Sequence, residues 1–430
     1  MIHMSEYMSG FGNHFESESV PGTLPAGRNS PQVVAKGLYA EQLSGTAFTA
    51  PKSENKKIWF YRIRPSVLHS EFEETKGYHF ETAAMGTRVP NPTQMRWDAM
   101  KEPATKTDFL HGLRTFVLNG SPESQTGMAI FLYSANQSMD GTYFYSSDGE
   151  WMIVPEKGKL VIHTECGVIE IAPTEIAVIP RGMKFSVDLV DGFSRGYVCE
   201  NYGQAFRTPD LGPIGANGLA AARDFLSPVA RYEDKKGFFK LVNKFYGRVF
   251  TSQLEHSPLD VVAWHGNYVP YKYDLKKFNT IGTVSFDHPD PSIFTVLTSP
   301  SGQPGVANCD FVIFPPRWMV GEDTFRPPYY HRNVMSEFMG LIKGVYDAKE
   351  EGFVPGGSSL HNCMSAHGPD EQVFTKASEA DLKPMKIENT LAFMWESCYP
   401  FVTSDYAVNG GLRQIDYLSC WKSLKGQFKK

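Results

Sequence analysis

The stretch from residue 113 to residue 200 constrains the fold most, because it repeats one local pattern several times. Short runs of β-branched and aromatic residues, such as GMAIFLYSAN at 127–136, are separated by turn signals. The dipeptides Asp148-Gly149, Lys157-Gly158 and Cys166-Gly167 are three of these signals. Short strands with a turn about every eight to twelve residues are typical of an antiparallel sandwich or barrel.

The segment LVIHTECGVIEIAPTEIAVIPRGMKFSV at 160–187 refines this prediction. A strand leads to a glycine turn, a second strand, a polar corner and then IPRG before the next strand. This order of strands and turns is typical of a cupin, a small antiparallel barrel of the jelly-roll kind. The 13% aromatic content, with 38 Gly and 29 Pro, also favours many short strands and turns with few helices.

The C-terminal part of the chain repeats this order of strands and turns, but the residues match less well. CDFVIFPPRWMV at 309–320 ends in FPPRW, which echoes IPRG and suggests an internal duplication. The predicted organisation is therefore a large N-terminal β domain at 1–280, with an extended arm over 1–58 and a metal-free barrel. A smaller C-terminal β domain follows at 281–430. Helices are expected at 215–226 and 376–382, and a strand at 57–67.

Composition excludes several classes of function. The net charge of −5 argues against a nucleic-acid footprint, which would need clustered Lys and Arg. No apolar run reaches the roughly 20 residues that cross a bilayer, and the N-terminal stretch does not resemble a signal peptide. The six cysteines are far apart and form no C-x-x-C pair, so we expect reduced thiols in a cytoplasmic protein.

His331 and Glu337 are the first candidate metal ligands, in PPYYHRNVMSEFMG at 327–340. On one straight strand six residues would separate them by about 20 Å, and on one helix they would face different sides. They can therefore share a metal ion only if the chain bends between them. Asn333 can start such a turn, and it stands where the first cupin motif has its second histidine.

A third ligand is expected from LHNCMSAHGPD at 360–370. By spacing after the PGG turn His361 is the first choice, and His367 is the competitor. Two histidines and one carboxylate match the facial triad of non-haem Fe(II) oxygenases, although catalytic zinc can use the same set. Nearby aromatic residues favour an aromatic substrate and O₂; these are Trp318, Tyr329, Tyr330, Phe338 and Tyr346.

Each of these residues also has a plainer interpretation. His331 could be a buried, hydrogen-bonded histidine and Glu337 a surface glutamate. His288, in SFDHPDPS, could be an ordinary loop histidine, or a general base whose pKa is raised and whose ring is oriented by Asp287 and Asp290. Spacing alone does not decide between these readings.

Longer stretches resemble the homogentisate 1,2-dioxygenase family over nearly the whole chain. They occur in the family's order: YMSGFGNHFESE (7–18), GLYAEQLSGTAFTAPK (37–52), WFYRIRPS (59–66), FRPPYYHRNVMSEFMGLIKG (325–344) and PGGSSLHNCMSAHGPD (355–370). Blocks of this length are far more specific than three ligands. The resemblance implies opening of the homogentisate ring with O₂ to give maleylacetoacetate, in the breakdown of phenylalanine and tyrosine.

The resemblance also assigns residues. It implies one Fe(II) per chain, bound by His331, Glu337 and His367, and so prefers His367 to His361. It places the proposed base at His288 and the contact to the acetate carboxylate at Tyr346, with His367 also near the substrate. Asn333 and His361 stay as weaker candidates that support the ligands. The family is a hexamer, a dimer of trimers.

Three rival functions follow from the same residues. A related cupin could cleave gentisate or another dihydroxybenzoate. A storage or ligand-binding cupin could keep the barrel without catalysis. A zinc-dependent isomerase or hydrolase is the third alternative.

Overall fold

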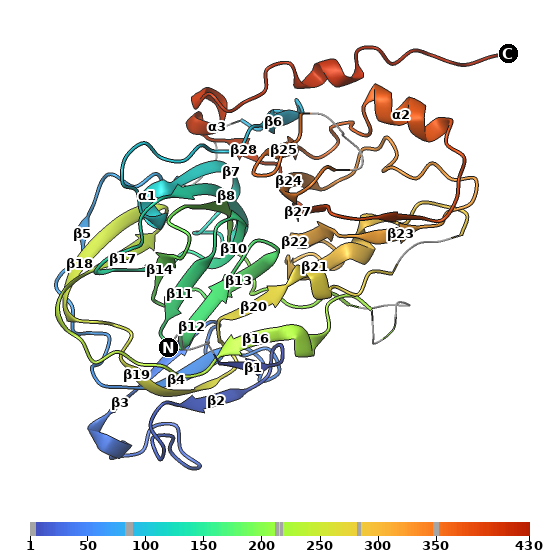
Figure 1. The fold of residues 1–430 in the computed structure, drawn as a ribbon. Coiled ribbons are helices and arrows are strands. Elements are labelled where there is room, and N and C mark those ends of the chain that lie inside the picture. The colour runs from blue at the N-terminus through green and yellow to red at the C-terminus, as the bar shows by residue number, and fades with distance from the viewer. Residues whose placement is uncertain (1–5, 82–88, 211–214, 216–217, 282–284, 347–351) are drawn as a thin grey trace.

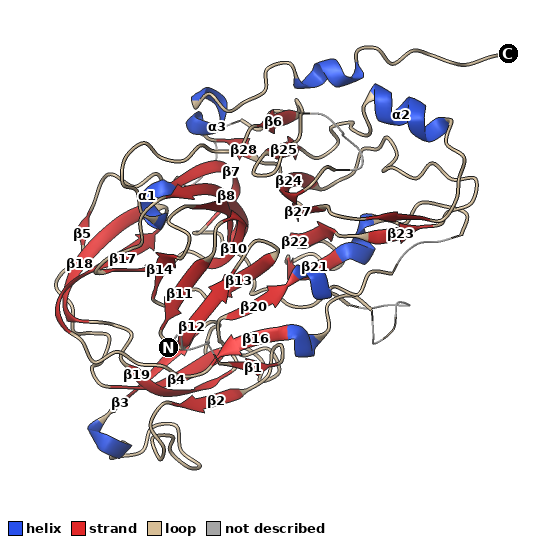
Figure 2. Cartoon of the chain, viewed as in Figure 1, coloured by secondary structure: helices blue, strands red, loops and turns tan. Residues whose placement is uncertain are grey.

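The protein is mainly β, as predicted, with short helices (Figures 1 and 2). The computed structural model describes residues 6–81, 89–210, 215, 218–281, 285–346 and 352–430. Within these residues the α-helices are α1 (Phe109–Gly112), α2 (Glu371–Ser378) and α3 (Asp405–Asn409). None of the helices in this part of the chain is long and apolar enough to span a membrane.

Two large sheets face each other in the N-terminal half, as expected for a jelly-roll sandwich. The nine-stranded sheet has the order β1 (Tyr7–Ser9), β16 (Phe225–Pro228), β20 (Tyr271–Asp274), β13 (Glu175–Ile179), β10 (Glu150–Lys157), β15 (Ser194–Asn201), β8 (Thr126–Ala135), β7 (Leu113–Ser121) and β28 (Val402–Thr403). The seven-stranded sheet has the order β12 (Gly167–Ile171), β11 (Leu160–Thr164), β14 (Phe185–Leu189), β9 (Thr142–Ser146), β17 (Lys236–Phe245), β18 (Arg248–His256) and β5 (Glu73–Glu74).

Three smaller sheets complete the fold. The four-stranded sheet has the order β2 (Phe15–Glu18), β19 (Val261–Gly266), β4 (Lys57–Arg62) and β3 (Tyr39–Ser44). The six-stranded sheet of the C-terminal part has the order β21 (Thr295–Pro300), β22 (Ala307–Phe314), β27 (Leu391–Ser397), β24 (Ser336–Lys343), β25 (Ser358–His361) and β6 (Met95–Trp97). A two-stranded sheet pairs β23 (Arg317–Met319) with β26 (Met385–Ile387).

The nine-stranded sheet is the central layer, and both of its faces are buried. Successive side chains of a strand point to opposite faces. On β8, Ala129 and Phe131 pack in the core shared with the seven-stranded sheet. Ile130 and Leu132 pack in a second core that extends to the six-stranded sheet. The continuous apolar run of β8 is therefore explained by burial on both faces.

Each half of the chain supplies a strand to a sheet of the other half. β6, from the N-terminal half, pairs with β25 at the edge of the six-stranded sheet. β28, from the C-terminal half, pairs with β7 in the nine-stranded sheet. The boundary near residue 280 stays a prediction, but the parts on either side of it complete each other's sheets.

The three predicted turn dipeptides lie at strand ends. Gly158, between β10 and β11, has a φ of +75°, and a Cβ there would lie 2.1 Å from the carbonyl oxygen of Phe193. Only glycine fits this conformation and this close approach. The predicted arm at 1–58 is ordered where it is described, because β1, β2 and β3 each pair with a strand outside the arm or at its edge.

The helix prediction at 215–226 is wrong over its described residues. Ala222–Asp224 form a short 3₁₀ turn, and Phe225 begins β16, where it pairs with Tyr273 and is fully buried. Tertiary packing overrides the local propensity of the alanine-rich stretch. The helix predicted at 376–382 overlaps α2 only over 376–378, because α2 spans Glu371–Ser378. It begins at Glu371, where the Asp370 carboxylate accepts a hydrogen bond from the Val373 backbone N–H at 2.8 Å.

Candidate metal centre and cavity

The chain bends between His331 and Glu337, as their spacing required. His331 lies in an isolated bridge, and β24 begins at Ser336. Between them the Asn333 Oδ1 accepts a hydrogen bond from the Met335 backbone N–H at 2.6 Å. Asparagine side chains stabilise turns in this way, so Asn333 supports the bend that brings Glu337 back towards His331.

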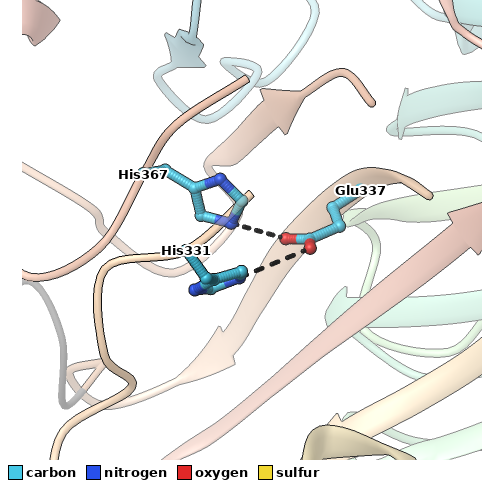
Figure 3. Close-up of side chains that lie close together, drawn as sticks. All are labelled: His331, Glu337 and His367. Atoms are coloured by element: carbon cyan, nitrogen blue, oxygen red, sulfur yellow. Dashed lines mark hydrogen bonds and ion pairs between the residues drawn. The ribbon is translucent and has the colours of Figure 1, made fainter. Parts of the chain in front are cut away.

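Three side chains converge at the start of β24 (Figure 3). One ligand atom from each of His331, Glu337 and His367 lies within 4.8 Å of the others. The Glu337 Oε2 is 3.0 Å from His367 Nε2, and its Oε1 is 3.8 Å from His331 Nε2. A single divalent ion bound at about 2.0–2.2 Å from each atom needs donors this close to one another.

The backbone holds the two histidines side by side. The His331 N–H donates to the His367 carbonyl at 3.0 Å, and the His367 N–H donates to the His331 carbonyl at 3.1 Å. Their ring centroids are 4.2 Å apart. This bridge joins the segment before β24 to the loop after β25, so two regions that are distant in sequence share one site.

The ring orientations of both histidines favour a cation between them and Glu337. His331 Nδ1 lies 2.7 Å from the Tyr329 carbonyl oxygen, and His367 Nδ1 lies 2.9 Å from the Ser365 carbonyl oxygen. An imidazole that donates from Nδ1 presents a lone pair at Nε2 when it is neutral. Both lone pairs then face a carboxylate, which is unfavourable unless a proton or a metal ion lies between them.

The electrostatics of Glu337 agree with this arrangement. Burial alone would raise its pKa, but the contacts with His331 and His367 outweigh burial and hold the pKa of Glu337 well below its usual range. The contact with Glu337 in turn raises the pKa of His331. Asn333 Nδ2 also donates to the Glu337 Oε1 at 2.5 Å. The carboxylate is therefore ionised and fixed in orientation.

His361 lies beside the three candidate ligands, but its Nε2 is directed towards Tyr417 and not towards Glu337. Its Nε2 is 3.0 Å from the Tyr417 hydroxyl, and its ring stacks on that of His367 at 4.2 Å with an interplanar angle of 7°. Spacing alone made His361 the first choice for the third ligand, but among the described residues the structure groups His367 with the other two. His361 instead packs against His367 and limits how that ring can turn.

The three-residue group opens into a cavity of about 460 Å³. Cross-strand neighbours of the six-stranded sheet form its floor. Glu337 stands opposite Glu396 on β27 and His361 on β25, and Met339 stands opposite Met394. All five residues line the cavity. The floor therefore has one polar row beside the ligands and an apolar row next to it.

His288 and Tyr346 also line the cavity. His288 Nδ1 lies 2.8 Å from the Pro289 carbonyl oxygen. The orientation of this ring by the flanking aspartates stays a prediction. The Asp287 carboxylate accepts the His288 backbone N–H, and the Asp290 carboxylate accepts the Tyr329 hydroxyl. A contact such as that of Asp287, from a short side chain to a neighbouring backbone N–H, is common in loops.

Of the five aromatic residues expected around the site, Tyr329 and Tyr346 line the cavity. Trp318 is 53% exposed on β23, and Phe338 is buried in the core between the sheets. Tyr330 packs on Phe374 of α2. Strand alternation explains the positions of Trp318 and Phe338, whereas Tyr329, Tyr330 and Tyr346 lie outside the strands, where tertiary contacts decide which side chains line the cavity.

Sequence reasoning missed four charged residues of the cavity, which are Arg96, Arg317, Arg332 and Glu396. Glu396 belongs to a segment that reads as a closing strand, and only the register of β27 places it beside Glu337. Burial, with Glu337 and Asp310 nearby, raises the pKa of Glu396 to about 8. Arg96 comes from β6, the strand that the N-terminal half inserts.

Two family models, described as the N-terminal and C-terminal parts of homogentisate 1,2-dioxygenase, match residues 6–275 and 276–428. The chain belongs to the homogentisate 1,2-dioxygenase family. Its function is thus that of a dioxygenase acting on homogentisate, a small aromatic acid. Together the matches cover the same stretches that carry the resemblance noted from the sequence.

Two solved structures show a weaker similarity to this chain. A variant of Bacillus subtilis oxalate decarboxylase is 11% identical, with 79% of this chain and 88% of that chain covered and a TM-score of 0.30. A cupin 2 conserved barrel domain protein from Leptotrichia buccalis is 10% identical, with 69% and 91% covered and a TM-score of 0.27. At this similarity neither structure carries an argument about the site.

Proposed function

We propose that this dioxygenase opens the ring of homogentisate with O₂ to give maleylacetoacetate, in the manner of an extradiol-type enzyme, with one Fe(II) per chain. His331, Glu337 and His367 would hold the ion. The observation that carries the proposal is the convergence of two anchored Nε2 atoms and one ionised carboxylate at the edge of a cavity. Family membership supports the same set.

Iron fits this donor set and this reaction better than zinc. Two neutral imidazoles and one carboxylate leave coordination positions open for substrate and O₂. When bound, Fe(II) would supply the redox chemistry that activates O₂, whereas zinc has no redox chemistry. The side chains of the cavity then have to bind the substrate, orient it and move its protons.

His288 is the proposed proton acceptor. Its Nδ1 is placed to donate to the Pro289 carbonyl, which leaves the lone pair of the neutral ring on Nε2. From the cavity wall this atom would take the proton of the ring hydroxyl that lies ortho to the acetate arm. Loss of that proton makes the ring electron-rich and prepares it for attack by oxygen.

Tyr346 is the proposed contact to the acetate carboxylate. It is 8% exposed and packs edge-on against Phe314, with ring centroids 5.5 Å apart. A phenol fixed by packing can donate one well-directed hydrogen bond, and fixing the arm determines which ring carbon faces O₂. The hexameric assembly and the cytoplasmic location stay predictions, from the resemblance and from the cysteine pattern.

The test is O₂ consumption by the metal-stripped protein after loading with Fe(II) or with Zn(II). We expect homogentisate-dependent O₂ uptake and the ultraviolet absorbance of the ring-opened product with Fe(II) alone. Faster turnover of gentisate would favour the related ring-cleaving cupin. Iron that binds without O₂ uptake would favour a non-catalytic cupin, and activity with Zn(II) would overturn the iron assignment.

A further inference from the structure

The apolar row of the cavity floor takes no part in the metal site or in the proposed proton transfer. Met339 on β24 and Met394 on β27 stand directly opposite each other on neighbouring strands, and both line the cavity (Figure 1). They are 5% and 2% exposed. The Cβ atoms of directly opposite residues are about 5 Å apart, so the two methionines form one continuous apolar surface beside the substrate space.

This methionine row lies next to the candidate metal ligands on the floor. Met339 follows Glu337 by two residues on β24, and both side chains therefore point to the same face of the sheet. Two residues of a strand correspond to about 7 Å. Tyr346 follows β24 further along the chain. The order along this strand is thus ligand, methionine and then the proposed contact to the acetate arm.

The neighbouring strands give the same order. Ala392 precedes Met394 by two residues on β27 and stands opposite Phe314 of β22. Opposite residues share one face of a sheet, so Phe314 continues the floor one row beyond the methionines. The Phe314 ring is 5.5 Å from that of Tyr346, measured between centroids. A substrate that reaches from the metal ligands to Tyr346 therefore passes over the methionine row.

The phenylalanines of the cavity lie at its far end. Phe294 is 6.3 Å from Phe314, and Phe353 is 6.2 Å from Tyr346, measured between ring centroids. All four side chains line the cavity. These rings therefore surround the end at which Tyr346 would hold the acetate arm, whereas the methionine row lies where the benzene ring of the substrate would be.

Methionine suits a contact with an aromatic ring. Its thioether sulfur is polarisable and makes favourable contacts with aromatic rings, often at the ring edge. Its unbranched, flexible side chain adapts to the outline of a flat molecule. Contact between the ring and this apolar surface also removes both from water, which favours binding.

We propose that Met339 and Met394 form the surface against which the aromatic ring of homogentisate packs. This inference rests on the proposed function, because it concerns the substrate of the same site. The two side chains would position the ring between the candidate metal ligands and Tyr346. They would also limit the size of the substituents that the ring can carry.

The first test removes the sulfur atoms and keeps the volume. Dissociation constants of homogentisate are measured without O₂ on the Fe(II)-loaded protein and on its Met339→Leu and Met394→Leu variants. We expect each constant to rise by about 2–10-fold, the usual range for the loss of a contact between sulfur and an aromatic ring. Leucine is close to methionine in volume, so circular dichroism and iron content should stay unchanged.

The second test makes space beside the ring. Met339→Ala and Met394→Ala each shorten one side chain of the surface. Homogentisates that carry one methyl group at a free ring position are compared with homogentisate itself. For at least one derivative we expect the ratio of its dissociation constant to that of homogentisate to fall by about 4-fold or more, because the methyl group fills the new space. A variant that only disturbs the core has no reason to favour a larger ring.

Met152 provides the matched controls. It is 0% exposed on β10 and belongs to the same hydrophobic core as Met339 and Met394. Among the described residues it is not part of the cavity lining. Met152→Leu and Met152→Ala should therefore leave the dissociation constant of homogentisate and all the ratios unchanged. If an alanine variant does not fold or bind iron, the leucine variants decide, and they must weaken binding.

Two results would overturn the inference. Unchanged dissociation constants in both leucine variants would remove the methionines from the substrate surface. Alanine variants that weaken homogentisate and all its methyl derivatives equally would indicate a structural role. Failure of the unmodified, iron-loaded protein to consume O₂ with homogentisate would instead refute the proposed function, before any variant is compared.

Discussion

At the scale of single residues, the candidate site depends on which atom of each histidine faces the carboxylate. His331 and His367 direct Nδ1 to backbone carbonyls and Nε2 to Glu337. His361 directs Nε2 to Tyr417. Hydrogen bonds of the second ring nitrogen set the tautomer and thereby the ligand atom. His361 and His367, which are six residues apart, thus make different contacts at the site.

The matched pair His367→Ala and His361→Ala tests this difference. We expect His367→Ala to lose stoichiometric iron and nearly all O₂ uptake, because one of three ligands is gone. His361→Ala should keep the iron, with affinity weakened by about 10–100-fold, as is usual for residues that support ligands. Iron content after dialysis against a chelator provides the measurement. Full iron retention in His367→Ala would refute the ligand assignment.

Glu150 allows a test of buried charge away from the candidate metal centre. It is 6% exposed, and its Oε1 accepts hydrogen bonds from Asn201 Nδ2 at 2.9 Å and from the Phe206 N–H at 2.6 Å. Burial outweighs these bonds and raises the pKa of Glu150 to about 7 from 4.5. Between pH 4.5 and pH 7 the folded protein keeps a proton on Glu150 that the unfolded chain releases. The free energy of unfolding therefore decreases as the pH rises through this range.

Glu150→Gln should remove that pH dependence. Below pH 4.5 we expect the variant and the unmodified protein to unfold at the same urea concentration. Above pH 7 the variant should be more stable by up to about 3 kcal/mol, the free energy that corresponds to this pKa shift. Urea unfolding curves between pH 4 and pH 8 measure the difference. A difference that stays constant with pH would contradict the raised pKa.

At the scale of elements, the exchanged strands connect the two parts of the chain. Trp97 on β6 makes one of these connections, because its ring contacts two sheets. Its ring is 5.9 Å from Phe116 of the nine-stranded sheet and 6.4 Å from Phe338 of the six-stranded sheet. Its Nε1 also donates to the Ala407 carbonyl at 2.6 Å. A three-residue strand thereby contacts both the nine-stranded and the six-stranded sheet, and it brings Arg96 to the cavity.

Trp97→Ala should lower the free energy of unfolding by about 3–5 kcal/mol, as expected for a large aromatic side chain that is removed from a packed core. Trp318→Ala is the control, because Trp318 is 53% exposed on β23. We expect its effect to stay within about 0.5 kcal/mol. Chemical unfolding of both variants in the metal-free state is the measurement, and similar effects would show that Trp97 does not connect the sheets.

At the scale of the whole molecule, the nine-stranded sheet is a shared middle layer. One of its faces packs on the N-terminal seven-stranded sheet, and the other packs on the sheet that carries Glu337. Glu337, one of the three candidate ligands, therefore lies on a strand whose support comes from both halves, and the bridge between His331 and His367 lies beside it. Sites on rigid, doubly packed elements hold their geometry better than sites on loops.

Separate expression of residues 1–280 and 281–430 tests this dependence. Each fragment lacks a strand of one of its sheets and exposes a core face, so we expect neither to give a cooperative unfolding transition alone. Mixing the two should restore native circular dichroism and iron binding. A fragment 281–430 that binds iron and unfolds cooperatively by itself would show that the C-terminal part is independent.

The sequence by itself determined the class of fold, the family and the need for a bend between His331 and Glu337. The class of fold and the bend follow from local rules: turn dipeptides, strand alternation and the reach of six residues. The family follows from the resemblance of long sequence blocks. The long blocks that resemble the family added His367 as a ligand, which spacing alone would have misassigned to His361.

Only the tertiary structure decided the cross-strand register, the strand exchange and the charged residues of the cavity. Glu396 faces Glu337 because β27 pairs with β24 in one register, and a shift of one residue would turn it away. Arg96 and Arg317 reach the cavity from a strand of the other half and from a separate two-stranded sheet. Such contacts depend on pairing between distant segments, which local sequence patterns do not encode.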